Sequence, residues 1–176
     1  MALNFKAKSE ETRNFLKLKS GESIQGVFRG DPYDFRIHWL QKEQRSVLCE
    51  GKDKCPVCKL GEKSSFRFRI NFITRDGEGY VAKVFEQGWQ SYQALINLQE
   101  SGYDLEKQIM MISRQGTGLN TAYSIIPSPK GLLTPEHQAK MRDVKLNELG
   151  HITEAETEPP TAVNEPPHHT DEDIPF

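Results

Sequence analysis

Apolar and polar residues alternate in several short stretches of this 176-residue chain, which predicts a protein built mainly from β-strands. The strongest alternation lies in residues 66–75, where Phe66, Phe68, Ile70 and Phe72 occupy every second position. Because successive side chains of a strand point to opposite faces, these four residues predict a strand with one face in the core.

Five further stretches also read as strands: 23–29, 34–40, 80–85, 107–113 and 119–126. Asp76-Gly77 and Gly116-Thr117-Gly118 are turn sequences, so each predicts a hairpin between the strands beside it. Helical spacing of apolar residues predicts one helix over 89–100. A second helix is predicted over 134–149, with Thr134 as its N-cap.

Five or six short strands with a helix between two hairpins favour a small barrel of the OB-fold type. A sandwich with a helical appendage is the alternative that this pattern leaves open. We expect an N-terminal arm over residues 1–20, one domain over 21–150 and a separate C-terminal tail over 151–176.

The C-terminal tail differs sharply in charge from the rest of the chain. It holds seven acidic residues and no Lys or Arg, which leaves 18 acidic and 23 basic residues, a formal charge of +5, in residues 1–150. The tail also carries two Pro-Pro pairs and a single aromatic residue, Phe176. Such a composition cannot bury enough apolar surface to offset the entropy of ordering, and it predicts disorder.

Three cysteines and one histidine form the sharpest chemical pattern in the chain. Cys55 and Cys58 have C-x2-C spacing, Cys49 lies six positions upstream, and His38 is the only histidine before position 137. Structural zinc sites take four nitrogen or sulfur ligands, so these residues predict a closed structural Zn²⁺ site within 38–58.

Other uses of the cysteines remain open. A C-x2-C pair also serves in thiol–disulfide exchange, and a free cysteine can be a small core residue. However, the pair lies in a Lys-rich loop between two predicted strands, and His38 lacks the H-x-E pattern of zinc deaminases. We therefore expect no enzymatic activity. The cysteines are odd in number and clustered, and the chain shows no export signal, which indicates a reducing cytoplasmic location. No apolar run reaches about 20 residues, so we expect no membrane span.

The order His38, Cys49 and Cys55-Pro56-Val57-Cys58 resembles the zinc-containing single-stranded DNA-binding proteins of T-even-like phages. The resemblance implies an OB-fold with a zinc subdomain that coats single-stranded DNA, without strong sequence preference, in replication, recombination and repair. It also implies the bacterial host cytoplasm as the location, and self-association on DNA. A zinc-stabilised RNA-binding or regulatory module is the alternative, because OB-folds bind both nucleic acids.

Binding a single strand requires cations along the phosphates and aromatic rings on which bases stack. The cation candidates are Arg29, Arg36, Arg67, Arg69, Arg75, Lys83 and Arg114. The preferred aromatic candidates are Trp39 and Tyr123, with Tyr33, Phe35, Tyr80 and Trp89 as further ones. Alternation predicts that Arg67 and Arg69 point outward together. For Trp89, at the start of the first helix, a place in the core is favoured over a base contact.

The chain ends in a compact acidic and apolar motif, Asp171, Glu172, Asp173, Ile174, Pro175 and Phe176. It closely resembles the C-terminal tip of bacterial single-stranded DNA-binding proteins, which recruits replication and repair proteins. A phenyl ring and carboxylates suit an apolar pocket with a basic rim. The acidic tail could also compete with DNA for the basic domain.

Overall fold

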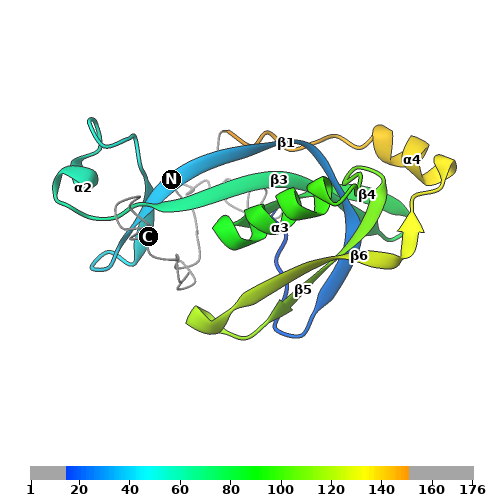
Figure 1. The fold of residues 1–176 in the computed structure, drawn as a ribbon, viewed down its shortest axis with the longest axis horizontal. Helices are drawn as coiled ribbons and strands as arrows, with labels where there is room; N and C mark the ends of the chain where they lie inside the picture. The colour runs from blue at the N-terminus through cyan, green and yellow to red at the C-terminus, as the bar shows by residue number, and fades with distance from the viewer. Residues whose placement is uncertain (1–14, 151–176) are drawn as a thin grey trace, which may run out of the picture.

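The computed structural model describes residues 15–150, and within them the protein is mainly β-sheet (Figure 1). The strands are β1 (Ser23–Leu40), β2 (Arg45–Leu48), β3 (Ser65–Asp76), β4 (Gly79–Gln87), β5 (Gln108–Gln115) and β6 (Ala122–Leu132). The helices are α2 (Pro56–Lys59), α3 (Trp89–Glu100) and α4 (Pro135–Arg142), with a short 3-10 turn η1 (Gly118–Asn120). The acidic tail and its tip lie outside the described residues.

All strand pairs are antiparallel, and the sheet order is β4-β3-β1-β5-β6, with β2 added to the far part of β1. The mainly β class predicted from the alternation is confirmed. The hairpins β3–β4 and β5–β6 lie on either side of β1, and α3 connects one hairpin to the other. This arrangement is compatible with a small barrel, although β4 and β6 are not paired with each other.

Strand β1 joins the two predicted strands 23–29 and 34–40 into one strand of 18 residues with a bulge between Arg29 and Tyr33. Its first part pairs with both β5 and β3, and Gly26 lies opposite Met110 on one side and Thr74 on the other. Its last part extends beyond the barrel with β3 as a ribbon that leads to α2 (Figure 1).

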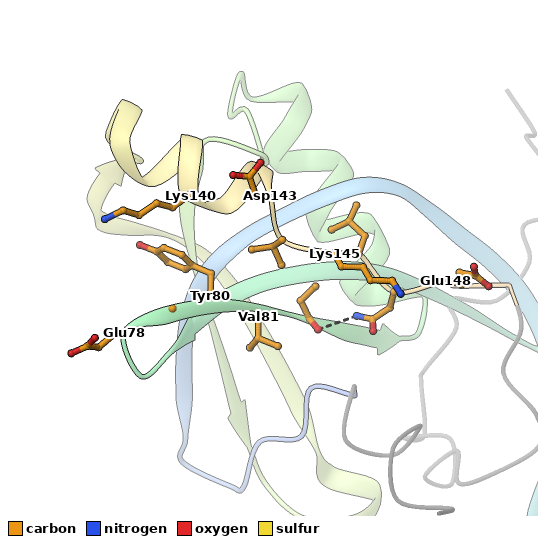
Figure 2. A pocket seen from close by; sticks show the side chains of 12 residues that line it. Glu78, Tyr80, Val81, Lys140, Asp143, Lys145 and Glu148 are labelled. Carbon is orange, nitrogen blue, oxygen red and sulfur yellow. Dashed lines mark hydrogen bonds between the residues drawn. The ribbon is translucent and has the colours of Figure 1, made fainter.

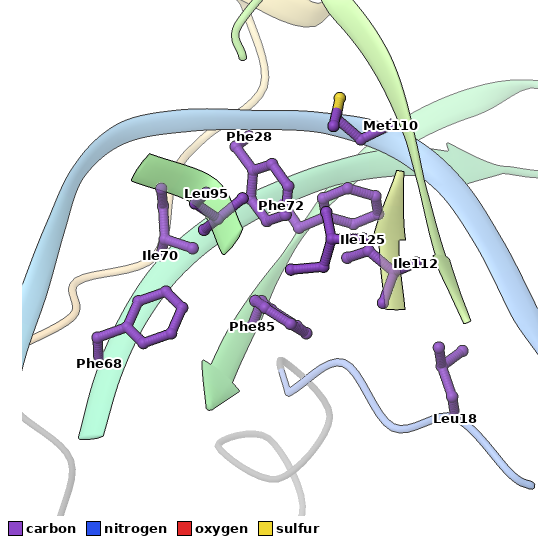
Figure 3. Packing of buried hydrophobic residues seen from close by; sticks show 10 residues of the cluster. All are labelled: Leu18, Phe28, Phe68, Ile70, Phe72, Phe85, Leu95, Met110, Ile112 and Ile125. Atoms are coloured by element: carbon purple, nitrogen blue, oxygen red, sulfur yellow. The ribbon is translucent and has the colours of Figure 1, made fainter. Parts of the chain in front are cut away.

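The main core contains the alternating residues of β3 together with residues from β1, β4, β5, β6 and α3. Phe68 and Phe72 are completely buried, as predicted, and Phe28 contacts Phe72 with ring centroids 5.0 Å apart (Figure 3). Leu18 also lies in this core, and the Leu16 backbone N–H donates to the Val84 carbonyl over 2.8 Å. Residues 15–20, assigned to an N-terminal arm from sequence, therefore pack against the barrel.

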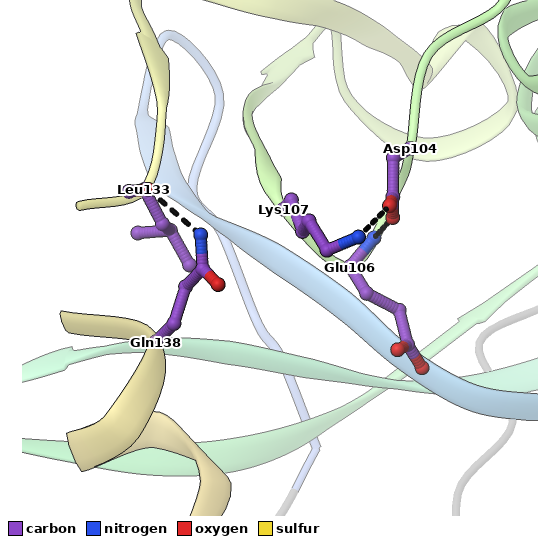
Figure 4. A network of polar contacts seen from close by, with 5 residues as sticks. All are labelled: Asp104, Glu106, Lys107, Leu133 and Gln138. Carbon is purple, nitrogen blue, oxygen red and sulfur yellow. Dashed lines mark hydrogen bonds and ion pairs between the residues drawn. The ribbon is translucent and has the colours of Figure 1, made fainter. Parts of the chain in front are cut away.

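The predicted last helix is shorter than expected, because α4 ends at Arg142 rather than at Leu149. Its start agrees with the prediction, since the Thr134 hydroxyl accepts a hydrogen bond from the His137 N–H over 3.3 Å. The Gln138 side chain donates to the Leu133 carbonyl beside this cap (Figure 4). The chain then continues as a C-terminal strap, residues 143–150, outside any helix.

The C-terminal strap is fastened to the outer face of β3 and β4 by one asparagine pair. The Asn147 N–H and side-chain amide donate to Asn71 Oδ1 over 2.9 and 3.0 Å, and Asn71 donates to the Asn147 carbonyl. Asn147 also donates to the Ala82 carbonyl, and the strap runs above β4 in Figure 2. Helical backbone from 143 onward could not offer these groups to Asn71, which explains the early end of α4.

A tight polar turn precedes β5. Asp104 accepts a hydrogen bond from the Glu106 N–H over 3.1 Å and an ion pair from Lys107 over 2.7 Å (Figure 4). The hydrogen bond from Lys107 lowers the pKa of Asp104, and the same contact raises the pKa of Lys107.

Gly26, where β1 pairs with β5 on one side and β3 on the other, gives a test of this fold. A Cβ there would lie 2.2 Å from the Ile73 carbonyl oxygen and 2.8 Å from the Phe72 ring, both in the core. We expect Gly26→Ala to lower the free energy of unfolding by about 3 kcal/mol or more, since neither neighbour can move freely. Gly79→Ala is the matched control, because its Cβ would meet only the Asp76 carbonyl at 3.8 Å. Urea unfolding of both variants measures the difference, and equal stabilities would contradict the assigned register.

Candidate metal centre and nucleic-acid interface

Four potential ligands meet at the far end of the β1–β3 ribbon. His38, Cys49, Cys55 and Cys58 place one nitrogen and three sulfur atoms within 4.8 Å of one another. Cys58 Sγ lies 3.5 Å from Cys49 Sγ and 3.2 Å from His38 Nε2. The three cysteines are free thiols, and His38 and Cys55 are buried. The structure thus brings together the four residues selected from the sequence, in a cluster that could hold a metal ion.

The backbone around this cluster is ordered by short local hydrogen bonds. The Cys49 N–H donates to the Arg36 carbonyl, which ties the end of β2 to β1. The Cys55 N–H donates to the Gly51 carbonyl over 2.8 Å, in a turn that needs the positive φ of 97° at Gly51. Cys55 then caps the single turn α2, which carries Cys58. Strand β2 and helix α2 were not predicted, because this polar segment shows no periodicity.

The orientation of His38 suits a metal ligand. Its Nδ1 lies 3.1 Å from the Lys63 carbonyl oxygen, which can only accept a hydrogen bond. Nδ1 therefore carries the hydrogen, and the lone pair of Nε2 faces the sulfur of Cys58. A backbone carbonyl that holds the second ring nitrogen is the usual outer partner of a metal-bound histidine.

The electrostatic surroundings of the thiols differ. The backbone N–H of Cys58, and further N–H groups of Val57 and Glu50, lower the pKa of Cys55 against the opposing effect of burial. Burial raises the pKa of Cys58 to about 11, and the neighbouring thiols Cys49 and Cys55 add to this rise. Without a cation, three thiolates this close would repel one another, whereas a divalent metal ion would offset two of their three negative charges.

Three of the seven predicted DNA-binding cations are bonded to other parts of the protein. Arg69 is buried, with an ion pair to Glu86 of 2.7 Å, so it does not point into solvent with Arg67 as expected. The strap explains this difference, because Arg69 also donates to the Leu149 carbonyl. Arg29 donates to the Met141 carbonyl and Arg114 to the Leu18 carbonyl.

The remaining candidates are scattered over the surface. Arg36 is exposed, and its guanidinium donates to the Ser64 hydroxyl and carbonyl over 2.8 and 3.0 Å. Arg75 lies at the β3–β4 turn, where it donates to the Gly77 carbonyl. Lys83 and Tyr123 are half-buried on the barrel, and Tyr123 packs against the core. These residues do not form one surface.

Trp39 and Arg67 share one face of the ribbon with the further aromatic candidates Tyr33 and Phe35. Positions 33, 35 and 39 of β1 lie on the same side, and Phe35 pairs with Arg67 of β3. We call Tyr33, Phe35, Trp39 and Arg67 the outer ribbon face. Tyr33 is 39% exposed and stacks on Phe35 with centroids 5.8 Å apart and ring planes at 25°.

A buried cation, Arg69, lies on the same face of the ribbon, because it pairs with Tyr33 of β1. The guanidinium carbon of Arg69 lies 4.4 Å from the centre of the Phe35 ring. The ion pair with Glu86 fixes the guanidinium, so Arg69 holds the ring in place. Tyr33, Phe35 and Trp39 are separated by even numbers of residues, so a single strand over 33–39 would have placed them on one face.

The described residues also line cavities at the surface. One, of about 790 Å³, lies between β4 and the strap, and its lining mixes Lys140 and Lys145 with Glu78, Asp143 and Glu148 (Figure 2). Another, of about 600 Å³, lies between α3 and the β1 bulge, with an apolar floor and an acidic rim. Neither cavity has the positive charge that a phosphate backbone requires.

No protein-family model matches the chain, and neither the curated proteins nor the solved structures include one with significant similarity to it. Among the helices of residues 15–150, none has the length and apolar character needed to cross a membrane. The functional assignment therefore depends on the geometry described above.

The ligand cluster predicts a clear effect of removing one sulfur. We expect Cys55→Ser to reduce bound metal from about one ion per chain to near zero and to lower the melting temperature, because the ion orders the loop. Lys54→Ala is the control, since this exposed neighbour in the same turn offers no ligand. Metal analysis by mass spectrometry and thermal melting measure both variants. Retention of the metal by Cys55→Ser would exclude a four-ligand site.

Proposed function

We propose that this protein binds and coats single-stranded DNA through the outer ribbon face, without strong sequence preference, and that it is not an enzyme. The observation that carries the proposal is the stacked pair Tyr33 and Phe35, aligned with Trp39 and opposite Arg67. Tyr33 is exposed, and Phe35 and Trp39 are half-buried. Aromatic rings stack on any base, and an adjacent cation attracts the phosphate. A role in replication, recombination and repair follows from the phage-type resemblance.

We further propose that the metal is a structural Zn²⁺. Three sulfurs and one imidazole nitrogen are a common structural zinc ligand set, and zinc bonds of about 2.0–2.3 Å place neighbouring ligand atoms roughly 3.5–3.8 Å apart. The separations of 3.5 and 3.2 Å at Cys58 need only a small outward movement. Four protein ligands leave no open position for a substrate, so the ion would hold the end of the ribbon rigid.

The loop that carries this site also adds positive charge next to the ribbon. Residues 41–64 contain six basic and four acidic side chains, and five of the six basic residues are lysines. In OB-folds, the loop after the first long strand is a frequent contact for oligonucleotides. The loop and the outer ribbon face together form a continuous candidate path for a strand.

The acidic tail begins beside the proposed surface. Gly150, the last described residue, lies against Tyr33, since a Cβ at Gly150 would be 3.9 Å from the Tyr33 ring. A tail of formal charge −7 that starts there can reach the same cations as DNA. We propose that the tail weakens DNA binding, and that its tip, Asp171 to Phe176, recruits replication or repair proteins.

Fluorescence titration with an oligo-dT strand tests the main proposal. We expect Trp39→Ala to weaken binding by about 1–3 kcal/mol, or roughly 5- to 150-fold, because one base loses its stacking partner. Affinity should also fall with salt, with a slope near −0.7 per phosphate contacted. Tyr103→Ala removes an aromatic residue of equal 39% exposure to Tyr33 that is not part of the outer ribbon face, and it should bind normally. Absence of salt-dependent binding in the wild-type chain would refute the function.

Deleting residues 151–176 tests the role of the tail. We expect the shortened chain to bind single-stranded DNA several-fold more tightly at low salt, with the difference shrinking as salt screens the tail. A chain whose acidic tail residues are replaced by Asn and Gln is the control for tail length. If the shortened chain bound single-stranded DNA with equal or weaker affinity than the full chain, the tail would not compete with DNA.

Competition between single-stranded DNA and single-stranded RNA of equal length tests the RNA alternative.

A further inference from the structure

The opposite face of the same ribbon carries a second aromatic cluster, which we call the inner ribbon face. It consists of Phe66 of β3 with Trp89 and Tyr92 of α3. Trp89 meets Phe66 edge-on with centroids 5.4 Å apart, and its centroid lies 5.8 Å from that of Tyr92. The sequence interpretation of Trp89 as a core residue is therefore wrong, since its side chain is held by two rings and remains 39% exposed.

Strand geometry sets this cluster apart from the outer ribbon face. Phe66 pairs with Arg36, whereas Phe35 pairs with Arg67, and neighbouring positions on a strand point to opposite faces. The pairing of β4 with β3 begins only at Phe68. At this point the sheet consists of β1 and β3, and each of its two faces carries aromatic rings.

The chemistry around Trp89 favours nucleobases as the occupant. The adjacent positions Gln90 and Gln93 are exposed amides, which can hydrogen-bond to base edges, and α3 carries no acidic residue before Glu100. Arg36 supplies a cation across the strand, and its guanidinium is exposed. Asp34 is the acidic residue of β1 on this face, and it lies farther towards the barrel, opposite Phe68.

We propose that the inner ribbon face is a second base-stacking surface, so that one chain holds two separate segments of single-stranded nucleic acid, one on each side of the ribbon. This inference deepens the proposed function and depends on it. The two ring sets point away from each other across a two-stranded sheet. A short oligonucleotide on one face therefore leaves the other free, which gives two binding events per chain.

The chain offers a direct test, because Trp39 and Trp89 are its only tryptophans and lie on opposite faces. Trp39→Phe leaves Trp89 as the reporter, and Trp89→Phe leaves Trp39. Each full-length variant is titrated with dT8 at low salt, and calorimetry on the wild type counts the oligonucleotides bound. We expect both reporters to be quenched, two dT8 strands per wild-type chain, and one per chain for Trp89→Ala. Ile126→Ala, at an exposed position of β6, is the control and should still bind two.

The outcomes separate the two proposals. Quenching of Trp39 alone with one dT8 per chain would overturn the second surface and leave the DNA-binding function intact. Quenching of both reporters by a single dT8 would overturn the claim of separate segments. Quenching of Trp89 alone would show that the outer ribbon face is not a contact. If dT8 neither quenches a reporter nor binds by calorimetry, the proposed function itself fails.

Discussion

The structure depends on one strand that pairs on both edges. β1 pairs with β5 and β3 near its start, and with β3 and β2 near its end, so it belongs to the barrel and to the ribbon at once. This requires close approach of the backbone at Gly26, where a side chain would strike the Ile73 carbonyl. The bulge after Arg29 then turns the strand outward, so the positions of His38 and of the outer ribbon face follow from β1.

The two ends of the molecule are stabilised by different kinds of interaction. At the barrel end, aromatic and aliphatic burial dominates, with Phe68, Phe72 and Ile112 fully buried. The segment that follows the ribbon is too polar to bury a comparable core, and it is tied by backbone hydrogen bonds and by the ligand cluster. Such a loop has little reason to stay ordered without a shared ion, since apolar burial does not offset its entropy.

Features that depend on residues close together in the sequence could be predicted from it. Alternation located β3, turn residues located the hairpins, and the spacing of Cys55 and Cys58 identified the ligand cluster before its geometry was known. Long-range contacts could not be predicted in this way. Arg69 is buried because Leu149, 80 positions later, lies over it. Helix α4 stops early because Asn147 bonds to Asn71, and no periodicity in the sequence encodes that partner.

The buried asparagine pair and Arg69 also explain which surface remains for a ligand. The strap covers the outer face of β3 and β4 along the barrel, where OB-folds often bind oligonucleotides, and it does so with satisfied hydrogen bonds. Displacing it would break the hydrogen bonds of Asn147 to Asn71 and to the Ala82 carbonyl, each worth about 0.5–1.5 kcal/mol. Gly150 of the strap lies against Tyr33, but Tyr33 stays 39% exposed, and the ribbon carries aromatic rings on both faces. Under the proposed function, a nucleic-acid strand on the ribbon avoids this cost and lies close to the cluster of His38 and the three cysteines.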